Sequence, residues 1–197
     1  MLILASASPR RQELLRNAGI PFTVQPADIN ETPLADEFPR ECAERLAREK
    51  ALAIFQSQPQ NHVLGADTIV VVDDAILGKP RDADDAARML RLLSGRTHAV
   101  ITGVCLVGKG VASGQWPVAS DAEELTASEM TLVTMCELSD HEIRDYIATG
   151  EPMDKAGAYA IQGIASRWIP RIEGDYSNVV GLPVALVYAM LRERGAI

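Results

Sequence analysis

Cysteine and histidine are scarce in this 197-residue chain, with three of each. Cys42, Cys105 and Cys136 lie far apart and form no C-x-x-C pair, so the sequence indicates neither a thiolate metal site nor a redox motif. Buried free thiols in a reducing compartment are expected instead. The histidines show no metal-ligand spacing, which gives no support to a zinc site or a Ser-His-Asp triad.

Long apolar runs and an excess of positive charge are also absent. No stretch approaches the roughly 18 to 20 apolar residues of a membrane span, and the apolar start MLIL is too short for a signal peptide. Acidic side chains outnumber basic ones by 27 to 19, for a net charge of -8. This disfavours an extended nucleic-acid surface, although a local basic pocket can still hold a small phosphorylated ligand. We therefore expect a cytoplasmic protein that binds neither membrane nor nucleic acid.

Strand and helix patterns alternate along the chain. Strands are predicted at residues 2–4, 22–27, 62–74, 97–108 and 130–138, and helices at residues 8–19, 39–56, 82–95, 139–150 and 183–195. This order, followed by hairpin elements, predicts a mixed α/β fold: a bent sheet with flanking helices and two lobes around a cleft. The length fits one domain over residues 1–197.

Local signals give finer expectations for the boundaries. Ser8, Pro9 and Gly19 are typical of the start and end of a helix, and Ser139 with Glu142 predicts a capping box.

The structure of the segments between these elements is predicted mainly from their amino-acid composition. We expect a small-residue bend after Leu64, a turn over residues 75–82 and a loop over residues 108–124. A loop with a short strand is expected over residues 151–165, and a hairpin over residues 167–183.

The stretch ASASPRR, residues 5–11, places two arginines at the start of the first helix. A helix N-terminus attracts anions, and the guanidinium groups of Arg10 and Arg11 suit phosphate oxygens. A capped surface helix with solvated arginines explains the same residues. The pattern is not a Walker loop.

Asp67 lies just before the β-branched run 69–72, where a lone carboxylate is costly to bury. It therefore needs a cation, a metal ion or a hydrogen-bond network, and it can serve as a metal ligand, as a general base or as a turn cap. Asp28 or Glu31 with Asp67 would make a Mg²⁺ set, although loop acids are more often solvated. Thr68 can hydrogen-bond a ligand or simply favour a strand.

Three lysines carry point charges that can meet phosphates, although most lysines are simply solvated. Lys50 lies on a predicted helix, Lys79 in a proline turn, and Lys155 beside Asp154. Gln162 can read a base edge through its paired donor and acceptor, or it can tie down its own loop.

Together these stretches resemble the Maf family of nucleoside triphosphate pyrophosphatases. The matching segments are LASASPRRQELL, LAREKA, LGADTIV, GKPRD, AARMLRLLSGRTHAV, GEPMDKAGAYAIQG and NVVGLP, which span nearly the whole chain. The resemblance implies a fold similar to inosine triphosphate pyrophosphatase and Mg²⁺- or Mn²⁺-dependent hydrolysis of a nucleoside triphosphate to the monophosphate and pyrophosphate. The combination of GADT with IQG is similar to the branch that acts on dTTP and UTP.

The resemblance also implies residue roles. Asp67 would be the catalytic carboxylate and would hold the metal with Glu31. Base specificity would come from Arg10, Thr68 and Gln162. The phosphates would be bound by Ser8, Arg11, Lys50, Lys79 and Lys155, with Asp154 also in the cleft.

The chain departs from the family in two places. Asn30 stands where members often carry an acid, and residues 107–130 form a longer stretch in which Trp116 has no assigned role.

Alternatives remain at this stage. The substrates can extend to modified pyrimidine triphosphates in a house-cleaning role. The resemblance also raises a nucleotide-binding regulator of septum formation, but acids at both Glu31 and Asp67 favour an enzyme. The apolar stripe of the C-terminal helix is more typical of a core, and it leaves a homodimer open.

Overall fold

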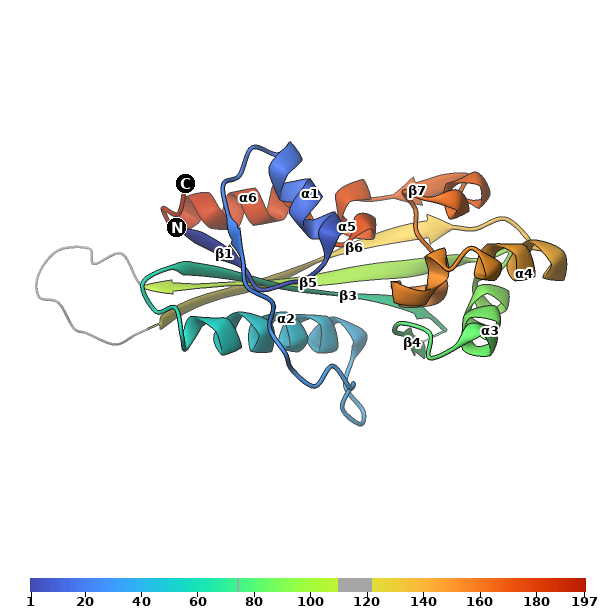
Figure 1. Ribbon diagram of the computed structural model, residues 1–197, viewed down its shortest axis with the longest axis horizontal. Coiled ribbons are helices and arrows are strands. Elements are labelled where there is room, and N and C mark those ends of the chain that lie inside the picture. Colours follow the sequence, from blue (N-terminus) through green and yellow to red (C-terminus); the bar gives the residue numbers. More distant parts are fainter. Residues whose placement is uncertain (74, 110–121) are drawn as a thin grey trace, which may run out of the picture. The chain divides into compact units, whose positions relative to one another are not determined.

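The computed structural model describes residues 1–73, 75–109 and 122–197, which form the predicted mixed α/β fold (Figure 1). The described strands are β1 (Leu2–Leu4), β2 (Thr23–Val24), β3 (His62–Val72), β4 (Ala75–Leu77), β5 (Thr97–Lys109), β6 (Ala122–Thr134) and β7 (Arg171–Glu173). They make one sheet in the order β2-β1-β3-β5-β6-β7, with β4 paired to β3. Parallel pairing of β1 with β2 and β3, and antiparallel pairing of β4 with β3 and of β7 with β6, make the sheet mixed.

The described helices include all five that the sequence predicted. They are α1 (Pro9–Asn17), α2 (Pro39–Phe55), α3 (Ala83–Leu93), α4 (Asp140–Ala148), α5 (Tyr176–Val180) and α6 (Val184–Glu193), with 3-10 turns η1 (Glu151–Asp154), η2 (Ala156–Ala158) and η3 (Ile164–Trp168). Ser8 caps α1 by accepting from the Arg11 amide, and Gly19 follows the helix with a φ of 67°. Ser139 and Glu142 form the expected capping box of α4. None of the described helices is long and apolar enough to cross a membrane.

The chain divides into two compact units. The first contains Met1–Asp67, Thr102–Glu129 and Gly181–Ile197, and the second contains Thr68–Ile101 and Met130–Val180, as far as these ranges are described. Strands β3, β5 and β6 each contribute residues to both units.

In the first unit, alternate residues of the strands face opposite helical layers. Figure 1 shows α1 and α6 on one side of the sheet and α2 on the other. Leu4, Leu64 and Leu106 pack in one core with residues of α1 and α6. Val63 and Cys105 pack in a second core with residues of α2. The alternation along β3 therefore decides which of its side chains face α2.

Gly65 lies inside the continuous strand β3, so the predicted small-residue bend after Leu64 is wrong. A Cβ on Gly65 would overlap the carbonyl oxygen of Ala47 in α2. Gly103 in β5 is equally close to the backbone at Ala43. Gly65 and Gly103 therefore allow α2 to pack closely on the sheet, and they do not change the direction of the chain.

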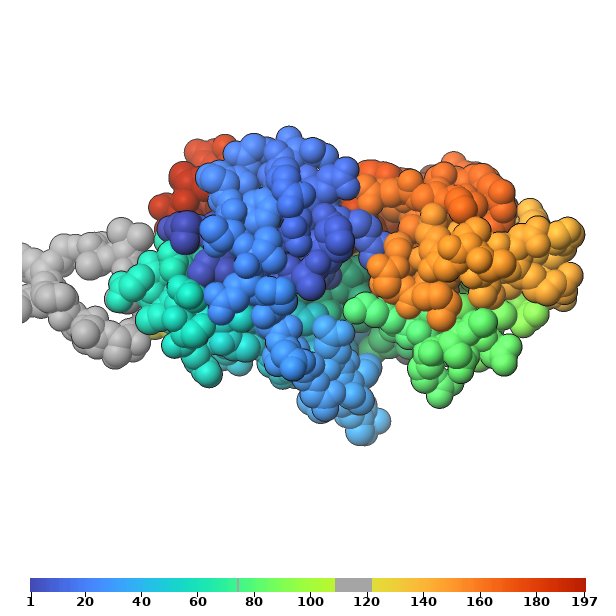
Figure 2. All heavy atoms as spheres, in the orientation of Figure 1, coloured from blue at the N-terminus to red at the C-terminus, as the bar shows by residue number. Residues whose placement is uncertain are grey.

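In the second unit, α3 packs against α4 and η2. Met89, Leu90 and Leu93 of α3 and Ile143 and Tyr146 of α4 are buried in its core. In Figure 2 the orange atoms after residue 150 lie against the green atoms of α3.

Three expected connections have a different structure. Residues 75–77 form strand β4 inside the predicted turn, and β6 already begins at Ala122 inside the predicted loop. Residues 151–165 contain 3-10 turns where a short strand was expected. Residues 110–121, with Trp116, lie outside the described part of the chain.

The predicted hairpin over residues 167–183 is also wrong. Strand β7 pairs with β6, with Ile172 opposite Val133, and the following residues form helix α5. The Asn178 side chain of α5 donates to the Val100 carbonyl and to the Thr131 hydroxyl. These partners are distant in sequence, so a local strand pattern cannot reveal them.

Candidate active site

An ion-pair cluster of two buried residues and one exposed residue lies in the first unit. Asp67 on β3 and Lys50 on α2 are only 8% and 6% exposed. Lys50 Nζ lies 2.5 Å from Asp67 Oδ1 and 2.6 Å from Glu31 Oε1. Of the three partners expected for Asp67, a cation, a metal ion or a hydrogen-bond network, the structure shows a cation, and it is a lysine.

Close packing of α2 on β3 places Lys50 beside Asp67. Gly65, two residues before Asp67, leaves space for the backbone of Ala47 and Ala51. Ala51 directly follows Lys50 on the same helix, so the contact that fixes the helix also fixes the lysine. Removing one partner of such a buried pair would leave the other charge uncompensated.

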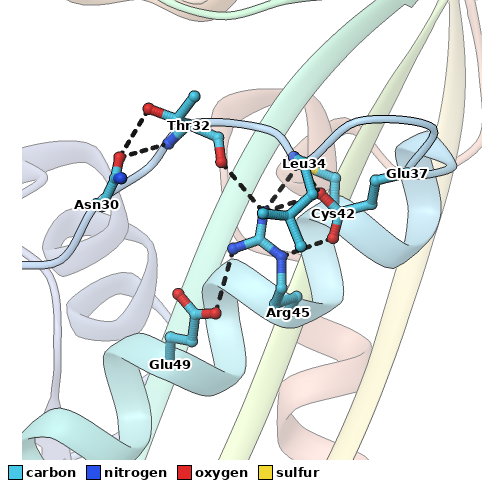
Figure 3. Close-up of polar contacts among 7 residues, drawn as sticks. All are labelled: Asn30, Thr32, Leu34, Glu37, Cys42, Arg45 and Glu49. Atoms are coloured by element: carbon cyan, nitrogen blue, oxygen red, sulfur yellow. Dashed lines mark hydrogen bonds and ion pairs between the residues drawn. The ribbon is translucent and has the colours of Figure 1, made fainter.

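Glu31 belongs to the connection of residues 25–38 between β2 and α2, which Figure 2 shows at the surface. Asn30 Oδ1 accepts from the Thr32 amide at 3.0 Å and from the Thr32 hydroxyl at 2.7 Å, which forms a tight turn around Glu31. Arg45 Nη2 donates to the Thr32 carbonyl at 3.3 Å (Figure 3). The neighbours of Glu31 are thus tied to helix α2.

The same arginine secures the far end of this connection. Arg45 Nε and Nη2 donate to the two carboxylate oxygens of Glu37 at 2.6 and 2.8 Å, and Nη1 donates to Glu49 at 3.2 Å. The hydrogen bonds from Arg45 lower the pKa of Glu37 to about 2. Sequence reasoning missed Arg45, whose only local signal is the i,i+4 spacing to Glu49.

Arg11 turns inward from the first turn of α1. Its Nε donates to the Gly181 carbonyl at 2.7 Å, and Nη1 donates to the Ala66 carbonyl at 2.8 Å and to Ser6 Oγ at 3.1 Å. Burial lowers the pKa of this guanidinium, and the negative charge of Asp67 partly opposes that shift. Arg11 therefore ties the helix start to the residue before Asp67, a role that its sequence context does not reveal.

The second unit contains the other predicted site residues. Lys155 Nζ donates to the Glu151 carbonyl at 3.0 Å and pairs with Asp154. The Gly157 amide donates to the Gly78 carbonyl at 3.0 Å, so the segments of Lys155 and Lys79 are joined.

Thr68 continues β3, and Gln162 is exposed in a turn after η2. The shared role of Arg10, Thr68 and Gln162 in recognition of the base stays a prediction.

The two carboxylates near Lys50 suit a hard divalent cation. Asp67 and Glu31 each place an oxygen within 2.6 Å of the same ammonium nitrogen, so they converge on one point. Magnesium is commonly held by one or two carboxylates together with substrate phosphates and water. Over the described ranges, no group of three or more His, Cys, Asp or Glu residues lies together. A metal held by these two carboxylates would need its remaining ligands from substrate and water.

The sequence matches the family described as Maf-like protein over residues 1–194, and the chain belongs to this family. Its relatives include three dTTP/UTP pyrophosphatases. That of Koribacter versatilis is 57% identical over 196 residues, covering 100% of this chain and 95% of the relative. That of Symbiobacterium thermophilum is 52% identical, covering 98% and 94%. That of Syntrophomonas wolfei is 50% identical, covering 98% and 96%.

Among solved structures, the Ham1 protein of Staphylococcus aureus overlaps 98% of each chain with a TM-score of 0.45 and 12% identity. This similarity is too low to support a conclusion about the chain.

Proposed function

We propose that this protein hydrolyses dTTP and UTP to the nucleoside monophosphate and pyrophosphate. The observation that carries the proposal is the buried Lys50–Asp67 pair, joined by the exposed Glu31, in a Maf-family chain. Relatives about 50% identical over their full length are named dTTP/UTP pyrophosphatase. The cluster supplies the carboxylate and cation that phosphoanhydride cleavage needs.

Asp67 is the group that we assign to the attacking water. Its Oδ1 accepts from Lys50, which fixes the orientation of the carboxylate. We assign Oδ2 to the water, which it orients and from which it takes a proton. The water oxygen bonds to the α-phosphorus, the bond from the α-phosphorus to the bridging oxygen breaks, and pyrophosphate leaves with that oxygen.

The leaving pyrophosphate needs positive charge. Lys79 and Lys155 of the second unit, and Lys50 of the first, are the lysines that we assign to the phosphates. Ser8 and Arg11 contribute at the start of α1, where Arg11 also donates to the Ala66 carbonyl inside β3. Asp154 forms an ion pair with Lys155.

Glu31 and Asp67 would hold a Mg²⁺ or Mn²⁺ ion. When bound, such an ion neutralises charge on the phosphate oxygens. Lys50 compensates the same two carboxylates through its own ammonium group.

Arg10, Thr68 and Gln162 are the residues that we assign to recognition of the base. The amide of Gln162 offers a donor and an acceptor, which suit the edge shared by thymine and uracil. Modified pyrimidines that keep this edge are substrates that the proposal includes.

The test is pyrophosphate release from a panel of nucleoside triphosphates, with and without Mg²⁺ or Mn²⁺. We expect metal-dependent turnover of dTTP and UTP and little turnover of purine nucleotides. Asp67→Asn should lose about 10²- to 10⁴-fold in kcat while still binding nucleotide. Asp84→Asn, at an exposed acid of α3, is the matched control.

Each other outcome has a defined meaning. Strong turnover of other nucleotides alone would keep the reaction and refute the base-recognition roles. Near-normal kcat in Asp67→Asn would refute the catalytic assignment. Nucleotide binding without turnover of any substrate would favour the regulatory role instead.

A further inference from the structure

Gln162 lies in a tight turn of the second unit. The Gly163 amide donates to the Ala160 carbonyl at 3.1 Å, which closes the turn around Ile161 and Gln162. Ile161 is 8% exposed, whereas Gln162 is exposed to solvent. The turn therefore buries the side chain of Ile161 and leaves that of Gln162 exposed to solvent.

One pair of side chains holds both ends of this turn. The Tyr146 hydroxyl accepts from the Ala160 amide at 3.1 Å and donates to Glu151 Oε1 at 2.8 Å. The Glu151 carboxylate accepts from the Ile164 amide, at 3.0 Å through Oε1 and 3.2 Å through Oε2. A single hydrogen-bonded pair thus spans residues 160–164.

Gly163 is required by the same arrangement. A Cβ at this position would overlap the carboxylate of Glu151. Glycine therefore allows the carboxylate to approach the backbone of the turn closely. Gly163, which follows Gln162, thus leaves the space that the Glu151 carboxylate occupies.

The Tyr146 ring is itself held firmly. It is 1% exposed and meets the Trp168 ring edge to face, with centroids 5.3 Å apart. Trp168 Nε1 donates to Glu142 Oε1 at 3.1 Å, and Glu142 belongs to the capping box of α4. The support of the turn therefore extends to both ends of α4.

We propose that Tyr146 and Glu151 are positioning residues that set pyrimidine selectivity by fixing the turn of Gln162. This inference rests on the proposed function, in which Gln162 reads the base. A turn that is held in one conformation loses less conformational entropy when Gln162 binds the base. It also discriminates against a base whose edge does not match. Without the pair, Gln162 samples other orientations and the discrimination falls.

The experiment compares Tyr146→Phe, Glu151→Gln and Glu151→Ala with Gln162→Ala. Tyr146→Phe removes the hydroxyl and keeps the ring against Trp168. Tyr188→Phe and Glu193→Gln, at exposed positions of α6, are the matched controls. The kcat and KM are measured for dTTP and for CTP, and the exchange of the Ala160 and Ile164 amides is followed by NMR.

We expect Tyr146→Phe to lower the dTTP-to-CTP ratio of kcat/KM by about tenfold, mainly through KM for dTTP. Glu151→Ala should act at least as strongly, and Glu151→Gln should recover part of the loss because its carbonyl can still accept. Amide exchange at Ala160 should accelerate in Tyr146→Phe and at Ile164 in Glu151→Ala. The two controls should match the wild type.

Other results overturn the inference in distinguishable ways. If Gln162→Ala lowers the ratio and Tyr146→Phe does not, the positioning role is refuted while the proposed function stands. An equal fall of kcat/KM for both nucleotides would show a purely structural role. If Gln162→Ala leaves the ratio unchanged, the base-reading role fails, and the positioning role fails with it.

Discussion

Lys50 shows how one residue can connect the fold and the site. Its ammonium group lies between two acids that come from different segments, Asp67 on β3 and Glu31 on the β2–α2 connection. Lys50 and Asp67 are buried, and their burial is tolerated because each has a partner of opposite sign, whereas Glu31 is exposed and pairs with the same ammonium group. The sequence predicted that Asp67 needs a cation, a metal ion or a hydrogen-bond network, but it could not choose among these or among the basic residues.

His98 is a second buried polar residue, and it leads to a prediction for stability. It is 2% exposed, its Nε2 lies 2.8 Å from the Tyr159 hydroxyl, and over the described residues its Nδ1 has no hydrogen-bond partner. Burial lowers the pKa of His98 to about 4. The folded state therefore favours the neutral ring, and protonation favours unfolding.

The sign of the pH effect follows directly. Above about pH 6.5, the pKa of histidine in the unfolded chain, the ring is neutral in both states and the folded state keeps its full stability. As the pH falls from about 6.5 toward 4, the unfolded chain binds a proton first, and the free energy of unfolding decreases by at most about 3 kcal/mol. Urea unfolding between pH 7.5 and 4.5 should show this decline, and His98→Phe should flatten it. An unchanged slope in His98→Phe would contradict the assignment.

Among the elements, the β2–α2 connection depends on α2 for its position. Arg45 binds the Thr32 carbonyl and the Glu37 carboxylate, on either side of Leu34. Arg45→Met should release residues 30–37, because both contacts are lost together. Hydrogen exchange measured by mass spectrometry should show faster exchange in this segment.

A matched control lies one turn further along the same helix. Arg48 pairs with Glu124, so Arg48→Met removes a different ion pair of α2. Residues 30–37 should exchange at the wild-type rate in this variant. Equal acceleration in both variants would show that the effect belongs to the helix as a whole.

The contact of β3 with α2 gives another prediction at the level of elements. A Cβ on Gly65 would meet the backbone of Ala47 and Ala51, so Gly65→Ala must push the helix and strand apart. We expect a loss of about 1–3 kcal/mol in the free energy of unfolding, and a weaker Lys50–Asp67 pair. Gly78→Ala has open space around its Cβ and should cost far less. Urea titrations of both variants test this difference.

Elements defined by local signals were predictable from the sequence, and those defined by distant partners were not. Helices α1 and α4 follow from Ser8 and Ser139 as caps, and β3 follows from its β-branched run. Strand β7 forms because β6 offers an antiparallel partner. The same holds at the site: the sequence singled out Asp67 and Gln162, but Arg45 and Tyr146 act through contacts that only the fold creates.

For the molecule as a whole, a bound cation should add stability. The net charge is -8, and Asp67 and Glu31 converge within the first unit. A ligand that binds only the folded state raises its stability by RT ln(1 + [L]/Kd), about 2.7 kcal/mol at 100 times Kd. Mg²⁺ or Mn²⁺ should therefore raise Tm in the absence of nucleotide.

The variants separate this site from a general charge effect. Glu31→Gln should abolish most of the rise in Tm, and Glu41→Gln, at an exposed position in the first turn of α2, should retain it. Differential scanning calorimetry with added metal and with chelator measures both. An equal rise in the two variants would mean that the cation screens the acidic surface without occupying the site.

Helix α2 makes contacts on several sides, and these contacts limit which amino-acid substitutions it can accept. Ala43, Ala47 and Ala51 meet the sheet, Lys50 meets two acids, and Arg45 holds the preceding connection. In a library of all single substitutions selected for activity, α2 should be among the least tolerant segments, with small-to-large changes at its alanines removed first. Efforts to engineer new nucleotide preferences are therefore better directed to the exposed turn of Gln162 than to the helix that supports the acids.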